Sequence, residues 1–306
     1  MRPLLWKPLL AVSFPFDPVT GDFRWDFVRF PVWASPKLDG YRAMVQRGAL
    51  VSRNGVLVAN RELQRRYGRK GLEGLDAELC AGCPATPGVF NLTSRVVRRA
   101  DADASTTTLY MIDRHGMPGG DFGSRHTALK TALRDEPYIM VIKQVLVKTL
   151  AALQAFEREC LRQGYEGVML RRGDQGPYPQ KPGKENRSTL REFDLVRLKR
   201  FEYAEAVILA VHSLRHNLND ARTRTGKRVT DKDGIVVDKS RIGSATLRDV
   251  ETGVEFDTTV ASEALRSWAG WRDPARWRGM TVRYKYQAVG TLDKPRINTC
   301  AFEELL

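Results

Sequence analysis

The sequence predicts an α+β protein of two domains, in which a domain of antiparallel sheets with helices is followed by a β-barrel. From Val32 to about residue 200, short runs of alternating apolar and polar residues are separated by turn residues and by three helical stretches. Beyond that point the chain reads as short strands with one helix, which suits a five-stranded Greek-key barrel, the OB-fold. We therefore expect one domain over residues 1–201 and a second over residues 202–306.

The first domain is predicted to alternate between strands and short helices. Strands are expected at 41–45, 50–58, 75–79, 109–113, 165–171 and 193–200. Of these, 50–58 is a hairpin that turns at Asn54-Gly55, and 75–79 is a strand edge that carries two acids. Helices are expected at 61–69, 126–134 and 146–163, and Gly164 ends the last of them. Residues 173–188 are rich in Gly, Pro and Lys, so we expect a loop there.

The second domain is predicted to be mostly β. Strands are expected at 204–211, 242–250, 254–260 and 280–287, with a helix at 262–269. Between the first two strands, residues 215–241 are polar with an excess of basic side chains. A long basic loop on such a barrel is a candidate nucleic-acid contact, and the alternative is a disordered, solvated insertion.

Composition favours a polyanionic partner. The chain has 306 residues, 42% of them hydrophobic, which is enough for two domains with real cores. Its formal net charge of +14 favours nucleic acid, although a basic protein without such a partner is the alternative.

The cysteines and the amino terminus point to the cytoplasm. Cys80 and Cys83 form a single C-x-x-C, and no second pair completes a zinc site with Cys160 or Cys300. We interpret all four as reduced thiols. The first residues contain no long apolar region, and no segment is long enough to span a membrane, so neither a signal peptide nor a membrane anchor is expected.

The stretch from Ser35 to Arg42 carries the candidate nucleophile. Lys37 stands one residue before Asp39-Gly40, where a tight turn is expected because Gly tolerates positive φ. A lysine amine is protonated at neutral pH and becomes a nucleophile when burial or neighbouring cations favour its neutral form. On this motif alone, an exposed turn with a solvated lysine is the better interpretation.

Four charged residues farther along the chain complete a possible phosphoryl-transfer site. Glu78 and Glu166 lie on apolar strands, where a carboxylate is unusual unless it has a partner or a function. Arg197 and Lys199 are two residues apart on a strand and therefore share one face of it. Cations would hold the α-phosphate oxygens, while carboxylates would hold Mg²⁺ and a ribose hydroxyl. The four histidines do not cluster, so we assign them no catalytic role.

These residues belong to motifs that occur in a definite order along the chain. The motifs are Lys37-Leu38-Asp39-Gly40-Tyr41-Arg42, Ser52-Arg53-Asn54-Gly55, Asp76-Ala77-Glu78-Leu79, Tyr110-Met111-Ile112-Asp113, Glu166-Gly167-Val168-Met169-Leu170-Arg171 and Leu195-Val196-Arg197-Leu198-Lys199. In this order the chain resembles the covalent nucleotidyltransferases, and most closely the small ATP-dependent DNA ligases of the bacteriophage type. The resemblance implies an adenylyltransferase domain, of the ATP-grasp-like ligase kind, followed by an OB-fold.

The resemblance also implies a reaction in three steps. Lys37 would attack the α-phosphorus of ATP, expel pyrophosphate and hold AMP covalently. AMP would then pass to the 5′-phosphate of a nick, and the 3′-hydroxyl would attack that phosphate and release AMP. The implied cofactors are ATP and Mg²⁺ or Mn²⁺, and the implied partner is nicked double-stranded DNA bound by a monomer in the cytoplasm.

By the same resemblance, Lys37, Asp39 and Lys199 are the catalytic residues, with Lys199 on the α-phosphate. Arg197 stands where the family usually has a second lysine; it keeps the charge but not the compact ammonium. Arg296, near the end of the chain, could orient pyrophosphate during the first step.

The remaining motif positions imply nucleotide and metal contacts. Arg42 and Arg53 match positions that hold the nucleotide and the 5′-phosphate. Glu78 matches a ribose or metal contact, and Glu166 matches the metal-binding acid. Tyr110 either stacks on adenine or belongs to the core.

Two alternatives remain open. An RNA ligase or a capping guanylyltransferase would use the same lysine chemistry, and a basic nucleic-acid-binding module would share the charge and the barrel. NAD as the adenylate donor is not expected, because no added N-terminal module and no zinc-finger cysteines are seen. A second Lys-Asp-Gly, at Lys232-Asp233-Gly234, lacks the spacer residue and is expected to be an ordinary turn.

Overall fold

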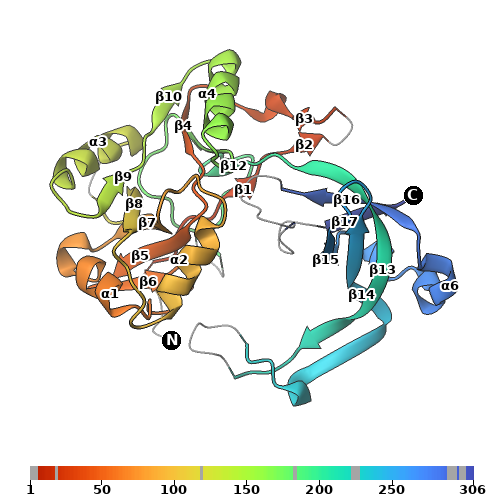
Figure 1. The fold of residues 1–306 in the computed structure, drawn as a ribbon. Coiled ribbons are helices and arrows are strands. Elements are labelled where there is room, and N and C mark those ends of the chain that lie inside the picture. The colour runs from red at the N-terminus through yellow and green to blue at the C-terminus, as the bar shows by residue number, and fades with distance from the viewer. Residues whose placement is uncertain are drawn as a thin grey trace. The chain divides into compact units, whose positions relative to one another are not determined.

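The chain folds into two compact units, Met1–Arg200 and Phe201–Leu306 (Figure 1). This computed structural model describes residues 6–17, 20–117, 120–181, 185–221, 228–287, 295 and 301–306. The division falls one residue before the boundary expected between residues 201 and 202. Mixed sheets with a few helices confirm the predicted α+β class.

The first unit is built on two five-stranded sheets. One has the order β1 (Val12–Ser13), β12 (Val196–Leu198), β11 (Val168–Arg172), β4 (Val32–Pro36), β10 (Val145–Val147). The other has the order β6 (Ala49–Ser52), β5 (Tyr41–Gln46), β7 (Leu75–Ala81), β8 (Thr107–Arg114), β9 (Ile139–Val141), and β2 (Phe16–Asp17) pairs with β3 (Asp22–Phe23) in a separate hairpin. Neither large sheet is wholly antiparallel as expected, because β1 runs parallel to β12 and β8 runs parallel to β9.

Helices flank these sheets (Figure 1). They are α1 (Arg61–Tyr67), α2 (Val89–Arg98), α3 (Phe122–Ala132) and α4 (Leu150–Arg162), together with the short 3₁₀ turns η1 (Trp25–Phe27) and η2 (Lys70–Leu72). Helix α1 lies beside β6, α2 contacts β7, α3 contacts β8 and α4 contacts β4. Within the described ranges, no helix has the length and apolar character needed to cross a bilayer.

Helix starts follow capping side chains rather than the apolar pattern alone. The Thr149 hydroxyl accepts a hydrogen bond from the Ala152 N–H, so α4 begins at Leu150 and not at 146 as expected. Leu146 instead pairs with Trp33 between β10 and β4. Asp121 likewise caps α3, which starts four residues before the predicted position.

The hairpin expected at 50–58 differs from the structure. The main hairpin, β5–β6, turns at Arg47 and Gly48, whose φ angles are 56° and 65°. The Asn54-Gly55 turn does form, but beyond it only a single bridge joins Leu57 to Val51. The strand expected at 75–79 is β7, which lies between β5 and β8.

Five strands of the second unit close on themselves. They are β13 (Glu202–Asn217), β14 (Ile235–Asp249), β15 (Glu255–Val260), β17 (Ala301–Leu305) and β16 (Thr281–Tyr286), in that order around the barrel. Strand β17, which the sequence pattern did not reveal, pairs parallel with β15 and antiparallel with β16. Three short helical segments replace the single predicted helix: α5 (Glu263–Arg266), η4 (Ala269–Arg272) and α6 (Pro274–Trp277).

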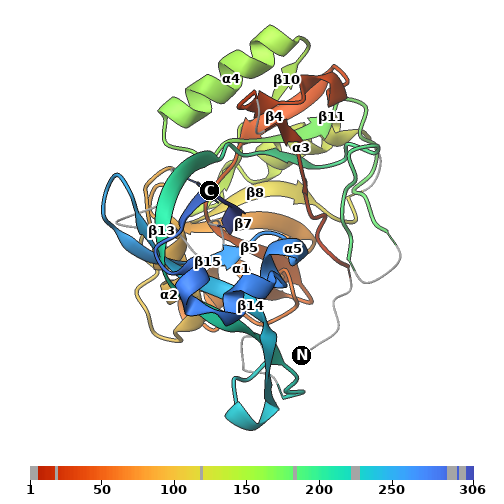
Figure 2. The same cartoon turned by 90° about the vertical axis from the view of Figure 1, so that its right-hand side faces the viewer.

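A long hairpin extends from this barrel (Figure 2). Strands β13 and β14 stay paired as far as Asn217 and Ile235, so the two ends of the region 215–241, residues 215–217 and 235–241, are strand rather than the expected loop. Residues 222–227, between the two strands in sequence, lie outside the described residues. The second Lys-Asp-Gly forms η3 (Lys232–Gly234), a short 3₁₀ turn capped by Asp231, which confirms that it is an ordinary turn.

Candidate active site

A cavity of about 350 Å³ in the first unit is lined by residues from both sheets. This volume suits a nucleotide-sized ligand. Its cationic lining consists of Lys37, Arg42, Arg53, Arg171, Arg187 and Arg197. Its apolar lining includes Leu38, Ile112, Ile142 and Met169. A cavity with cations beside an apolar surface can hold phosphates and a nucleobase at the same time.

Lys37 lies at the cavity wall because β4 and β11 are antiparallel neighbours. Pro36 is opposite Val168, and the Lys37 N–H donates to the Gly167 carbonyl oxygen at 2.9 Å. The Lys37 ammonium forms an ion pair with Oε2 of the buried Glu166. Oε1 of the same carboxylate is 3.5 Å from Nζ of Lys199. The structure therefore brings together three of the predicted site residues around one carboxylate.

Gly167 makes that arrangement sterically possible. Its φ is 147°, and a Cβ at this position would collide with the Leu198 carbonyl oxygen. The start of β11 can therefore approach the end of β12. This approach places Glu166 beside Lys199.

Glycine is required at position 40 for a different reason from the one expected. It does not adopt positive φ, and the chain bends there without a hydrogen-bonded turn. A Cβ on Gly40 would collide with the Leu79 carbonyl oxygen and with Sγ of Cys80. The glycine is required because the segment after Lys37 passes directly over β7.

Arg42 is held by a fully buried carboxylate on β7, that of Asp76. Its Nε and Nη2 donate to the two oxygens of Asp76, each at 2.6 Å. Burial alone would lower the pKa of Arg42, but the ion pair with Asp76 outweighs it and raises the pKa above the ordinary value. Arg42 therefore presents a permanent positive charge at the cavity wall, where it can contact a phosphate.

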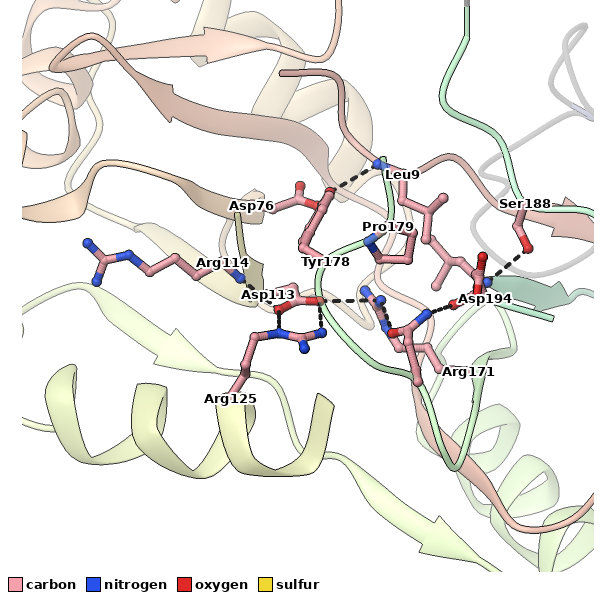
Figure 3. A network of polar contacts seen from close by, with 12 residues as sticks. Leu9, Asp76, Asp113, Arg114, Arg125, Arg171, Tyr178, Pro179, Ser188 and Asp194 are labelled. Carbon is pink, nitrogen blue, oxygen red and sulfur yellow. Dashed lines mark hydrogen bonds and ion pairs between the residues drawn. The ribbon is translucent and has the colours of Figure 1, made fainter. Parts of the chain in front are cut away.

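A second buried network lies under the same cavity (Figure 3). Asp113 accepts from Arg125 at 3.2 Å and lies 3.4 Å from a nitrogen of Arg171. Arg171 also donates to Gln175 at 2.9 Å, and Gln175 donates to the Asp194 carbonyl oxygen at 2.6 Å. These bonds join β8, β11 and the segment after β11 beneath the cavity floor.

Glu78 titrates near neutral pH. It lies opposite Arg42 in the β5–β7 ladder and lines the cavity. Burial raises the pKa of Glu78 to about 7, although the nearby positive charges of Arg42 and Lys37 act to lower it. A carboxyl group that ionises at this pH can bind a hydroxyl in either protonation state, and a cation when ionised.

The pKa of Glu78 leads to a prediction about stability. Between about pH 4.5 and pH 7, the folded protein keeps a proton that the unfolded chain has lost, so stability falls as the pH rises through this window. Glu78→Gln removes this titration. We expect the variant to gain up to about 3 kcal/mol relative to wild type between pH 4 and pH 8.5, at about 1.4 kcal/mol per pKa unit.

Urea unfolding of both proteins at the two pH values measures this gain. The value at pH 4, where the carboxyl is protonated in both states, serves as the internal control. A difference between the two proteins that does not change with pH would contradict the assignment.

Three arginines lie at the exposed side of the cavity. Arg53 follows β6, Arg197 is on β12, and Arg187 lies in the segment before β12. Burial, together with the positive charges of Arg187 and Arg53, lowers the pKa of Arg197. Like charges gathered at the rim favour an anion.

Comparison with solved structures assigns the fold. The chain matches no protein-family model and no curated protein sequence. The structure of the Chlorella virus DNA ligase-adenylate is 25% identical, with a TM-score of 0.53 over 99% of each chain. A Lig E DNA ligase is 21% identical, with a TM-score of 0.66 over 97% of this chain and 98% of the other. The chain has the fold of the DNA ligases. The resemblance inferred from the motifs is thereby confirmed.

Not every predicted residue reaches the cavity of this ligase fold. Tyr110 is half-buried in an apolar cluster with Leu38 and Ile142, and it is not among the lining residues. Ile112, two residues farther along β8, lines the cavity instead. Asp39 follows Leu38 in the bend and is also outside the lining set. Arg296 lies outside the described residues.

The protein alone does not build a metal site among the described residues. No group of three or more His, Cys, Asp or Glu side chains there is close enough to hold an ion. Glu78 and Glu166 are the acids beside the cavity. Two carboxylates suit Mg²⁺ when substrate phosphates and water complete its ligands.

Sequence reasoning missed two residues that the ligase fold brings to the site. Arg187 lines the cavity, and its Nη1 donates to the Ala11 carbonyl oxygen at 3.2 Å. Tyr178 is buried and bonds to Asp76. Both come from 173–188, which contains no helix or strand in its described part. Apart from the positive charge of Arg187 itself, this stretch contains no sequence signal that would place Arg187 at the cavity or Tyr178 beside Asp76.

Proposed function

We propose that this protein is an ATP-dependent DNA ligase that seals nicks in duplex DNA. The observation that carries the proposal is the contact of Lys37 and Lys199 with one buried carboxylate, Glu166, beside a cavity rimmed by arginines. It is supported by the DNA ligase fold over nearly the whole chain.

Lys37 is the proposed nucleophile. Its Nζ loses a proton and attacks the α-phosphorus of ATP; a P–N bond forms and pyrophosphate leaves. An oxygen of the 5′-phosphate at a nick then attacks the same phosphorus; a P–O–P bond forms, the P–N bond to Lys37 breaks, and the departing amine takes up a proton. In the last step, the 3′-hydroxyl attacks the activated 5′-phosphate and AMP leaves. Positive charge from Lys199 and from the cavity arginines stabilises the negative charge that develops on phosphate.

The cations around the cavity are the proposed phosphate contacts. Arg42, Arg53, Arg197 and Lys199 hold the nucleotide and the 5′-phosphate, and we add Arg187 to this set. The adenine lies against the apolar lining, since a nucleobase has two apolar faces. Stacking by Tyr110, a catalytic role for Asp39 and pyrophosphate orientation by Arg296 stay predictions.

Mg²⁺, or Mn²⁺ in its place, would be held by Glu166 and Glu78 together with substrate oxygens. When bound, it neutralises phosphate charge. The Lys37 and Lys199 contacts meanwhile fix the orientation of the Glu166 side chain.

The two units have separate proposed tasks. Residues 1–201 form the adenylyltransferase domain of the ATP-grasp-like ligase kind. The barrel of residues 202–306 is an OB-fold that binds the duplex. A monomeric enzyme acting in the cytoplasm stays a prediction.

Nicked duplexes test the proposed function directly. The purified protein is incubated with ATP, Mg²⁺ and nicked duplexes whose 3′-hydroxyl strand is DNA or RNA. Sealing of the DNA nick is expected. Sealing of the RNA nick alone would favour an RNA ligase, and binding without sealing would favour a nucleic-acid-binding module.

Salt dependence tests whether the hairpin of β13 and β14 contacts DNA. We expect binding to a nick to weaken steeply with salt, because each neutralised phosphate adds about −0.9 to the slope of log K against log[salt]. Replacing residues 217–239 with a two-glycine turn should make that slope shallower. Covalent labelling with ATP should be unchanged, because Lys37, Glu166 and Lys199 belong to the first unit.

A charge-only variant is the matched control for this deletion. Lys232→Gln with Lys239→Gln keeps the hairpin and removes two exposed charges. An intermediate slope is expected. A slope that is flat in the wild type, or unchanged by the deletion, would remove the hairpin from the DNA-binding surface.

A further inference from the structure

Asp76 is a buried carboxylate that no step of the proposed reaction uses. It is fully buried on the central strand β7. A charge in this position is unfavourable unless several donors compensate it. Both oxygens accept from Arg42, and Oδ2 also accepts from the Tyr178 hydroxyl. Three donors from two distant parts of the chain therefore satisfy one carboxylate.

Tyr178 is fixed in place on every side (Figure 3). Its hydroxyl accepts from the Leu9 N–H at 3.0 Å while it donates to Asp76. Its ring lies edge-on to Trp6 and to His115, with centroids 5.5 Å and 5.7 Å away. Burial raises the pKa of Tyr178 well above its ordinary value, so the hydroxyl remains a donor at any working pH.

The geometry of Arg42 shows what this chain of bonds controls. Asp76 occupies one edge of the guanidinium, the Nε and Nη2 N–H groups, and Arg42 lines the cavity with 17% of its side chain exposed. An arginine has five donors in a rigid plane, so fixing Nε and Nη2 also fixes the direction of the remaining N–H groups. Any change that lets the Asp76 carboxylate rotate will also rotate the Arg42 guanidinium. The Arg42 N–H groups that do not bond to Asp76 would then no longer point toward a ligand.

We propose that Tyr178 is a positioning residue for adenylyl transfer, acting through Asp76 to orient the Arg42 guanidinium toward a phosphate. This inference rests on the proposed function. Tyr178 does not line the cavity and does not touch the substrate itself. Its effect on the reaction passes entirely through Arg42.

A double-mutant cycle tests that last statement. Tyr178→Phe keeps the ring and removes the hydroxyl. In single-turnover labelling with ATP it should slow formation of the lysyl-AMP bond by about tenfold, as expected for loss of a hydrogen bond to a charged group. Arg42→Lys keeps the charge but cannot form the two-bond contact. In that background, Tyr178→Phe should slow the reaction less than about twofold, because the guanidinium that Tyr178 orients has already been replaced by an ammonium group.

Tyr138→Phe is the matched control, since Tyr138 is 51% exposed and belongs to the same unit. It should leave the rate unchanged. Equal slowing by Tyr178→Phe in both backgrounds, or none in the wild type, would overturn the inference, because a purely structural tyrosine acts independently of Arg42.

Proton exchange at Arg42 gives a readout that needs no activity. With ¹⁵N-labelled arginine, NMR should show slow exchange of the Arg42 Nε–H in the wild type and faster exchange in Tyr178→Phe. If the wild type forms no covalent label, the proposed function fails. Unchanged exchange in Tyr178→Phe overturns the positioning role by itself, whatever the result of labelling.

Discussion

Lys37→Ala is expected to abolish the covalent AMP label that the wild type acquires from α-labelled ATP and Mg²⁺. Lys199, which also contacts Glu166, cannot replace it, because Lys199 approaches the opposite oxygen from the end of a different strand. Removing a nucleophile costs at least about 10⁴-fold in comparable enzymes. Label retained on a denaturing gel measures the effect, and mass spectrometry of the labelled peptide locates the bond.

Lys232→Ala provides an internal control for that experiment. Lys232 also precedes Asp-Gly, but without the spacer residue, and it lies in the exposed turn η3 of the second unit. Labelling of this variant should equal that of the wild type. Label that persists in Lys37→Ala, or that maps to another side chain, would contradict the assignment of the nucleophile.

Elements determined by nearby residues could be predicted from the sequence. Strand β5 (Tyr41–Gln46) and helix α1 (Arg61–Tyr67) lie within two residues of the expected ranges 41–45 and 61–69, and Asn60 caps the helix. Strand β8 alternates buried and partly buried residues along its whole length. Helix α2 was missed although it has a well-defined apolar face, and its start is marked only by Gly88 in the left-handed region.

The sequence motifs predicted where the glycines lie but not why glycine is required there. Gly40 and Gly167 are required because a Cβ would meet the backbone of β7 or the end of β12. Those neighbours are distant in sequence, so no local rule reveals the collision. The spacing of a motif indicates that a glycine is needed, whereas only the packed sheets explain the need.

Side chains from the segment 173–188 could not have been assigned in advance. A stretch rich in Gly, Pro and Lys has no period, so its inward-facing residues cannot be told from the exposed ones. Tyr178 gains its role from Asp76 and Leu9, and Arg187 gains its place from Ala11. These contacts exist only after the amino-terminal segment, the second sheet and this loop have come together.

Glu166→Gln is expected to separate chemistry from DNA binding. The substitution keeps the size of the side chain and removes the charge that contacts both Lys37 and Lys199. Metal-dependent labelling with ATP should fall by about 100-fold, as when one preorganised electrostatic contact is lost from a reaction site. Affinity for a nick should change less than about twofold, because Glu166 is 5% exposed and is too deeply buried to meet the duplex surface.

Glu159→Gln is the matched control, because Glu159 is an exposed acid on α4 that pairs with Arg162 three residues later. It should change neither quantity, since exposed pairs of this kind contribute little. Labelling by filter assay and nick binding by fluorescence anisotropy, measured on the same preparations, give the two values. If Glu166→Gln lost labelling and nick binding to the same extent, the carboxylate would stabilise the fold of the first unit and would have no separate role in the reaction. If it lost labelling alone, Glu166 must act where the phosphorus is attacked, since neither the fold nor the DNA-binding surface would have changed.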